Sequence, residues 1–192
     1  DAPHRNIALT ALEGMGGIGK TALARALCRD EVVQHAYPDG IFWFTIGKEA
    51  SLRFDQRIEA VPGLKELLGA YNGEAACVSQ YCNALRDKAA LIVLDDVWRA
   101  GDIEPFRTES ARSRLLITTG DTGIAPSFGA REFTAELLTN GEAREVLARW
   151  AGLQDSVMLP AQAAGVMGEC GNLPLALAMI GAQLKGKAAG HW

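Results

Sequence analysis

The segment Gly14–Thr21, with the sequence GMGGIGKT, constrains this chain more than any other stretch. It matches the phosphate-binding pattern GxxxxGK[ST] at every fixed position. Glycines let backbone N–H groups approach a phosphate without obstruction by side chains. Such a loop leads into the start of a helix, where unpaired N–H groups and the helix dipole also favour an anion. The segment therefore predicts a phosphate-binding loop.

The residues around this loop supply the context that the pattern requires. The apolar run Ile7–Leu12 before it predicts a buried strand, and Leu23 and Leu27 after it recur at helical spacing. Lys20 would reach the β- and γ-phosphates as a mobile positive charge. The Thr21 hydroxyl would be a ligand for Mg²⁺, which takes few oxygens from the protein.

Composition narrows the class of protein. The chain has 192 residues, 48% of them hydrophobic, and a formal net charge of −4, which argues against a surface dedicated to nucleic acid. No apolar run approaches the ~20 residues of a membrane span. We therefore expect no membrane partner. The four cysteines have neither C-x-x-C nor zinc-ligand spacing, so we expect a reducing, cytoplasmic location. The chain starts without Met and stops at Trp192, and we interpret it as a piece of a longer protein.

A second informative stretch is Leu91–Asp96, in which four apolar residues are followed by two carboxylates. Open α/β sheets bind ligands at the carboxyl ends of their strands. One carboxylate at that place serves the Mg²⁺ shell in P-loop NTPases, and Asp95 is the candidate. Asp96 would lie near the attacking water as a base or orienting group. The alternative is that the Asp pair only ends a strand or caps a turn.

Further apolar runs predict the rest of a sheet. Ile41–Ile46 is continuously apolar and suits a central strand that is covered on both faces. Arg114–Thr119 is another strand that ends in hydroxyl residues, and Glu132–Leu137 is a last strand at the edge. Residues 51–87 read as interrupted helices. The fold class is therefore α/β: a P-loop NTPase with about five mostly parallel strands flanked by helices.

From residue 139 onward the pattern is entirely helical. Thr139–Glu142 forms a capping box, and three apolar helical faces follow before Gly186. We therefore expect a nucleotide-binding domain at 1–138 and a small helical subdomain at 139–192.

Four ordered motifs together resemble the NB-ARC family. They are GMGGIGKT at 14–21, LIVLDDVW at 91–98, SRLLITTGD at 113–121 and GNLPLAL at 171–177. This family includes plant resistance proteins, animal apoptosome scaffolds and bacterial signalling proteins. The resemblance implies a P-loop domain followed by the first part of a helical ARC subdomain. It also implies a closed resting form with ADP and an open signalling form with ATP.

The resemblance also implies roles for particular residues. Lys20 and Asp96 would be the catalytic residues, and Thr21 and Asp95 would serve the metal. In the family the proline of the fourth motif packs on the adenine side of the nucleotide, which makes Pro174 a candidate base contact; a role as the first-turn proline of a helix fits equally well. The implied nucleotide-binding residues are Gly14, Met15, Gly16, Gly17, Ile18, Gly19, Lys20, Thr21, Ala22, Thr119 and Pro174.

The chain departs from the family in three places. Gly120 stands where the family usually has an Arg that senses the γ-phosphate, which puts turnover and ATP sensing in question. Arg112, Arg114 or an Arg from a partner could substitute. Only 13 residues precede Gly14 in the given sequence, so we expect that the segment that covers the adenine in the family is not included. The chain also ends before the second helical subdomain, and His191 does not lie in the family's Met-His-Asp motif.

The leading interpretation is an ADP- or ATP-binding switch domain for signal transduction, such as a defence response, with Mg²⁺ as cofactor. It would couple nucleotide state to conformational change and self-association, with effector and sensor domains in the same longer chain. Hydrolysis would be slow or absent, so that as an enzyme it is at most a slow Mg²⁺-dependent ATPase. The alternatives are an active P-loop enzyme, such as a motor-type ATPase or a small-molecule kinase, and a scaffold that has lost nucleotide control. A DNA-binding role lacks a basic stripe.

Overall fold

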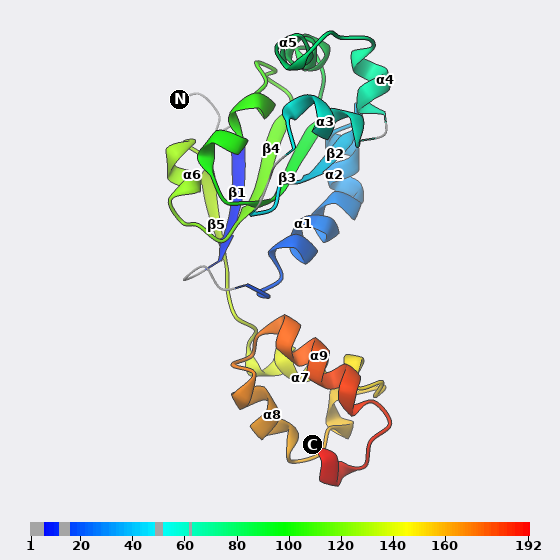
Figure 1. The fold of residues 1–192 in the computed structure, drawn as a ribbon. Helices are drawn as coiled ribbons and strands as arrows, with labels where there is room; N and C mark the ends of the chain where they lie inside the picture. The colour runs from blue at the N-terminus through cyan, green and yellow to red at the C-terminus, as the bar shows by residue number, and fades with distance from the viewer. Residues whose placement is uncertain (1–5, 12–15, 49–51, 62) are drawn as a thin grey trace. The chain divides into compact units, whose positions relative to one another are not determined.

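The computed structural model describes residues 6–11, 16–48, 52–61 and 63–192, with residues 6–11 described as backbone only. In this part of the chain a five-stranded sheet has the order β2-β3-β4-β1-β5 (Figure 1). The β2–β3, β3–β4 and β4–β1 pairs are parallel, which confirms the predicted α/β fold with a mostly parallel sheet. The strands are β1 (Asn6–Ala11), β2 (Ile41–Thr45), β3 (Leu91–Val97), β4 (Arg114–Thr119) and β5 (Arg131–Ala135).

Helices cover both faces of this sheet. Ala24 of α1 is buried against Leu91, Val93 and Leu116 on one face. Residues of α3, α4 and α5 pack on the other face against β2, β3 and β4, in a larger core that includes the ring contacts of Phe44, Phe54, Tyr81 and Phe106. The helices of this part are α1 (Lys20–Arg29), α2 (Glu31–Ala36), α3 (Phe54–Glu59), α4 (Leu64–Leu68), α5 (Glu74–Leu85) and α6 (Ile124–Ser127).

The expectation of a central position for Ile41–Ile46 is wrong. β2 lies at one end of the strand order, and only β3 pairs with it. Phe42 and Phe44 are buried in the larger core, whereas Ile41 and Trp43 are only half-buried on the face of α1. A continuous apolar run predicts contacts on both faces, but it carries no information about how many neighbours the strand has within the sheet. The predicted edge strand near Glu132–Leu137 is confirmed as β5.

By contacts between residues, the chain divides into a unit of residues 1–14 and 20–134 and a unit of residues 15–19 and 135–192. The second unit contains α7 (Asn140–Trp150), α8 (Ala163–Glu169) and α9 (Pro174–Leu184) around its own core. The predicted capping box is confirmed: Thr139 Oγ1 accepts the N–H of Glu142 at 3.3 Å, and Glu142 Oε2 accepts the N–H of Thr139 at 2.8 Å. This bond from the Thr139 backbone lowers the pKa of Glu142.

Two further observations concern the described residues as a whole. Their helices are all too short or too polar to cross a bilayer. The four cysteines are unpaired thiols, and burial raises the pKa of each one. The thiols are therefore predominantly protonated at neutral pH.

In the second unit, α9 approaches α7 closely at Gly181. A Cβ atom at this position would lie 2.8 Å from Trp150 Cβ and 3.0 Å from the carbonyl oxygen of Leu147. Because Leu147 O is backbone, the two helices would have to separate to admit a methyl group. Glycine at 181 thus permits the observed separation of these helices.

We expect Gly181→Ala to lower the free energy of unfolding of the helical unit by about 1–3 kcal/mol, the usual cost of overpacking. Urea denaturation followed by circular dichroism measures this change. Gly165→Ala is the matched control, because a Cβ at this exposed position in α8 would meet no atom within 4 Å. Alanine there should be neutral or stabilising by up to about 1 kcal/mol. Equal stability of the two variants would contradict the assigned role of Gly181.

Candidate nucleotide-binding site

The described part of the glycine loop has the backbone that its sequence predicts. Gly17 and Gly19 have φ angles of 83° and 100°, a region that side chains make unfavourable. Helix α1 begins directly afterwards, at Lys20. Gly14 and Met15 lie outside the described residues. Ile18 is buried and Ala22 is exposed on α1.

The hydroxyl of Thr21 and the carboxylate of Asp95 meet, although 74 positions separate them in the sequence. Thr21 Oγ1 donates to Asp95 Oδ1 at 2.7 Å. Thr21 lies in the first turn of α1, and Asp95 lies near the carboxyl end of β3. Asp95 is only 4% exposed, so its charge depends on such donors. The structure thus brings together the two residues that the sequence analysis assigns to the metal.

The backbone of β3 carries a bulge at the two carboxylates. Leu94 pairs with Ile117 and Val97 with Thr119, so Asp95 and Asp96 together face the single residue Thr118. Asp96 has a φ angle of 61°, which is in the left-handed region. Bulges redirect side chains and are frequent beside active sites. Here Asp95 is buried, whereas Asp96 is exposed.

The hydroxyl of Thr118 connects both halves of this bulge. Thr118 Oγ1 donates to Asp95 Oδ1 at 2.6 Å and accepts the N–H of Asp96 at 2.9 Å. The sequence analysis did not single out this residue. The available signal was the hydroxyl pair that ends β4, beside a strand that ends in two carboxylates.

The Asp96 carboxylate accepts a hydrogen bond from the residue that follows β3. Trp98 Nε1 donates to Asp96 Oδ1 at 2.9 Å. The Lys48 ammonium lies 5.1 Å from the centre of the Trp98 ring, a cation–π contact. A role for Asp96 at an attacking water stays a prediction.

Lys20 interacts electrostatically with the carboxylates of Asp95 and Asp96. Partial burial lowers the pKa of Lys20, while the charges of Asp96 and Asp95 raise it by less. A phosphate placed at this lysine would offset the desolvation of the ammonium group.

Thr119 occupies a different environment from Thr118. Its side chain is fully buried, and its Oγ1 accepts the N–H of Asp121 at 3.0 Å. Its hydroxyl therefore stabilises the loop after β4, and a nucleotide contact of Thr119 stays a prediction.

In the second unit, Pro174 is the first residue of α9, which confirms its interpretation as a first-turn proline. Within the same unit, the N–H of Leu175 donates to Gly17 O at 3.2 Å. Contact of Pro174 with adenine stays a prediction.

Arg112 and Arg114 do not replace the arginine that the family usually has at position 120. Arg114 begins β4 and Thr119 ends it. Five steps of about 3.3 Å separate their Cα atoms by about 16 Å, more than an arginine side chain spans. Arg112 precedes the strand and is farther away. Arg114 Nη1 instead donates to the carbonyl oxygens of Ala111 and Ser113, at 2.9 and 2.8 Å.

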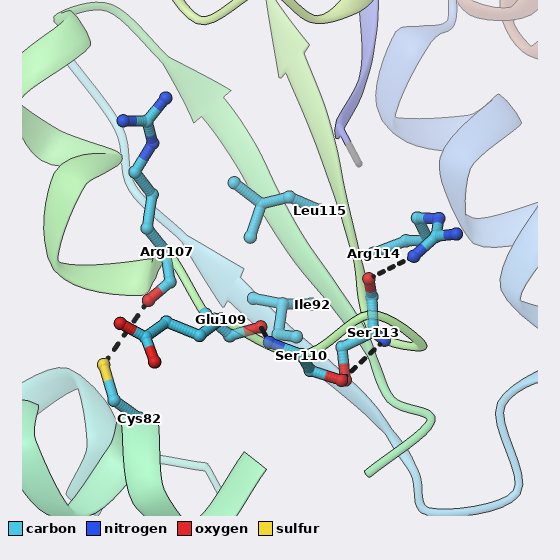
Figure 2. A pocket seen from close by; sticks show the side chains of 9 residues that line it. Cys82, Ile92, Arg107, Glu109, Ser110, Ser113, Arg114 and Leu115 are labelled. Atoms are coloured by element: carbon cyan, nitrogen blue, oxygen red, sulfur yellow. Dashed lines mark hydrogen bonds between the residues drawn. The ribbon is translucent and has the colours of Figure 1, made fainter. Parts of the chain in front are cut away.

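Arg114 lines a cavity of about 450 Å³ at the amino ends of β3 and β4 (Figure 2). The guanidinium groups of Arg107 and Arg114 point away from each other there. The hydroxyls of Ser110 and Ser113 both donate to Lys88 O at 2.8 Å. These groups serve the loop before β4 and do not converge on a ligand.

Two known proteins with similar sequences illustrate what this chain resembles. A probable disease resistance protein of Arabidopsis thaliana is 31% identical over 188 residues, which cover 94% of this chain and 22% of that protein. Apoptotic protease-activating factor 1 of Homo sapiens is 24% identical over 185 residues, which cover 91% of this chain and 14% of that protein. The chain thus spans about a fifth, or less, of the length of these relatives.

Two solved structures have a similar fold, each with a TM-score of 0.53. Cdc6p from Pyrobaculum aerophilum is 17% identical, with 74% of this chain and 41% of that chain covered. The ORC2 protein of Aeropyrum pernix, solved as ADPNP and ADP complexes, is 13% identical, with 95% and 62% covered. The NB-ARC domain profile matches residues 3–156, which include the glycine loop, both carboxylates and the Thr118–Thr119 pair. This chain belongs to the NB-ARC domain family.

Proposed function

We propose that this chain is an ADP- and ATP-binding switch domain of a signalling protein, with slow or absent hydrolysis. Its output would be a conformational change and self-association, transmitted to effector and sensor domains of a longer chain. Residues 1–138 would bind the nucleotide, and residues 139–192 would be the first part of the helical ARC subdomain. Membership of the NB-ARC family supports this proposal.

The observation that carries the proposal is the bond between Thr21 and Asp95. A glycine loop can turn the chain without binding anything, and an Asp pair can end a strand without serving a metal. Here the last residue of the loop motif and the strand-end carboxylate share a 2.7 Å hydrogen bond. Lys20 lies beside them, within the field of the same carboxylates. A scaffold with no use for nucleotide has no need of this combination.

The donor set suits Mg²⁺. A hydroxyl and a carboxylate are hard oxygen donors, and Mg²⁺ binds through one or two such groups together with phosphate oxygens and water. Thr21 Oγ1 and Asp95 would hold the ion, which would supply positive charge to offset the negative charge of the phosphates. Asp96, aimed away by the bulge, would be available to orient water.

The lack of an arginine at position 120 supports a switch over an active enzyme. An arginine at a transferring phosphoryl group contributes roughly 10³–10⁵ in rate. Arg112 and Arg114 lie at the other end of β4, so only an arginine from elsewhere would supply this charge. Steady turnover well above about one per minute would favour the enzyme instead.

We expect the chain to bind ADP and ATP with Mg²⁺ at micromolar Kd, about −8 kcal/mol, and Lys20→Ala to weaken binding at least tenfold, about 1.4 kcal/mol. The reason is the loss of the charge that faces the phosphates. Isothermal titration calorimetry with each nucleotide measures both values. Lys65→Ala removes an exposed lysine of α4 and is the matched control. If the wild-type chain bound no nucleotide, the scaffold interpretation would replace the switch.

We further expect Gly120→Arg to increase the affinity for ATP relative to ADP, because a guanidinium after β4 would face the γ-phosphate. Competition between the two nucleotides for the same chain measures this ratio. Gly120→Gln adds comparable bulk without charge and should leave the ratio unchanged. An equal gain for ADP and ATP would show that the added arginine does not sense the γ-phosphate.

A further inference from the structure

The Asp95–Asp96 bulge places one residue of β3 in an unfavourable backbone conformation. Its two carboxylates have different surroundings: Asp95 is buried beside Thr21, and Asp96 is exposed. At this bulge Asp96 has a φ angle of 61°, a left-handed conformation that is unfavourable for a residue with a side chain. Such a conformation persists only where its surroundings hold it.

The neighbouring strand β4 supplies the group that holds Asp96 in this conformation. In a regular ladder an N–H of β3 that faces β4 would donate to a carbonyl of β4, but the extra residue shifts the register between Leu94 and Val97. The N–H of Asp96 donates instead to the side chain of Thr118, at 2.9 Å. Thr118 is only 1% exposed, so water is not at hand to replace this acceptor.

The same hydroxyl also fixes the direction of Asp95. A hydroxyl has one proton and two lone pairs. Since the N–H of Asp96 occupies a lone pair, the proton of Thr118 remains for Asp95 Oδ1, at 2.6 Å. Thr21 donates to the same carboxylate oxygen at 2.7 Å. Asp95 Oδ1 thus accepts one hydrogen bond from a hydroxyl of α1 and one from a hydroxyl of β4, and together these bonds orient the carboxylate group.

We propose that Thr118 is a positioning residue for the metal site: through one hydroxyl it orients the Asp95 carboxylate and holds Asp96 in its left-handed conformation. This inference rests on the proposed function, because it concerns how Mg²⁺ is held with the nucleotide. In this proposal Thr118 acts through Asp95 and Asp96 and is not itself a ligand of the metal or the phosphates. Its effect is to keep Asp95 in place beside Thr21 and to direct Asp96 elsewhere.

The proposal predicts a selective defect. Thr118→Val keeps the shape of the side chain but removes both hydrogen bonds. Groups that orient metal ligands typically contribute 10–100-fold in metal affinity. We therefore expect the Mg²⁺ concentration at half-maximal enhancement of ADP binding to rise about 10–100-fold. The affinity for ADP in EDTA should stay within about twofold, because the glycine loop and Lys20 are unchanged.

The experiment uses the 192-residue chain and a fluorescent ADP analogue, titrated first in EDTA and then with Mg²⁺. Thr118→Ser restores the hydroxyl and should return the Mg²⁺ dependence to within about threefold of wild type. Thr118→Cys keeps only a weak donor and should give an intermediate value. Thr134→Val makes the same change at an exposed position of β5 and is the matched control.

Each outcome bears on the proposal. A Thr118→Val chain with the wild-type Mg²⁺ dependence would overturn it. So would an equal loss of ADP binding in EDTA and in Mg²⁺, since Thr118 would then support the whole fold and not the metal site. If Thr118→Val does not fold, the Thr118→Cys value decides in the same way. If wild type binds ADP but Mg²⁺ has no effect, this inference fails while nucleotide binding stands; if wild type binds no ADP, both fail.

Discussion

The buried carboxylate of Asp95 is the interaction on which the candidate site depends. A charge removed from water needs hydrogen-bond donors, and here two hydroxyls provide them, from Thr21 of α1 and Thr118 of β4. These bonds join a helix and two neighbouring strands at the carboxyl ends of the strands. The packing of the sheet domain and the geometry of the site are therefore linked through a single oxygen atom, Asp95 Oδ1.

The parallel sheet gives the domain two chemically different ends. At the carboxyl ends of the strands, the bulge of β3 separates Asp95 from Asp96, and Lys20 lies within their field. At the amino ends, the polar groups around Ser110 and Ser113 are used by the loop that precedes β4. Arg114 belongs to this second end. An arginine that is close to Gly120 in sequence is thus far from it in space, because an extended strand separates them.

The helical unit is organised by close packing. Gly181 lets α9 approach the backbone of α7, and the capping box at Thr139 satisfies the first turn of α7. Its core is separate from the two layers that cover the sheet. The sequence pattern of this unit therefore reveals local features such as the helix cap. It does not reveal the close approach of the two helices.

The sequence by itself predicted the main elements and the residues of the candidate site, because these predictions follow from local rules. The glycine loop, the start of α1, the capping box and the strand that leads to Asp95 all have patterns within a few residues. The tertiary structure alone decided which strands are neighbours. It placed β2 at an edge, despite its continuous apolar run, and β4 beside the carboxylates. The role of Thr118 and the bulge could not be predicted from the sequence for the same reason. A side-chain hydrogen bond between strands depends on their register, and register is a property of the strand pair and not of either strand.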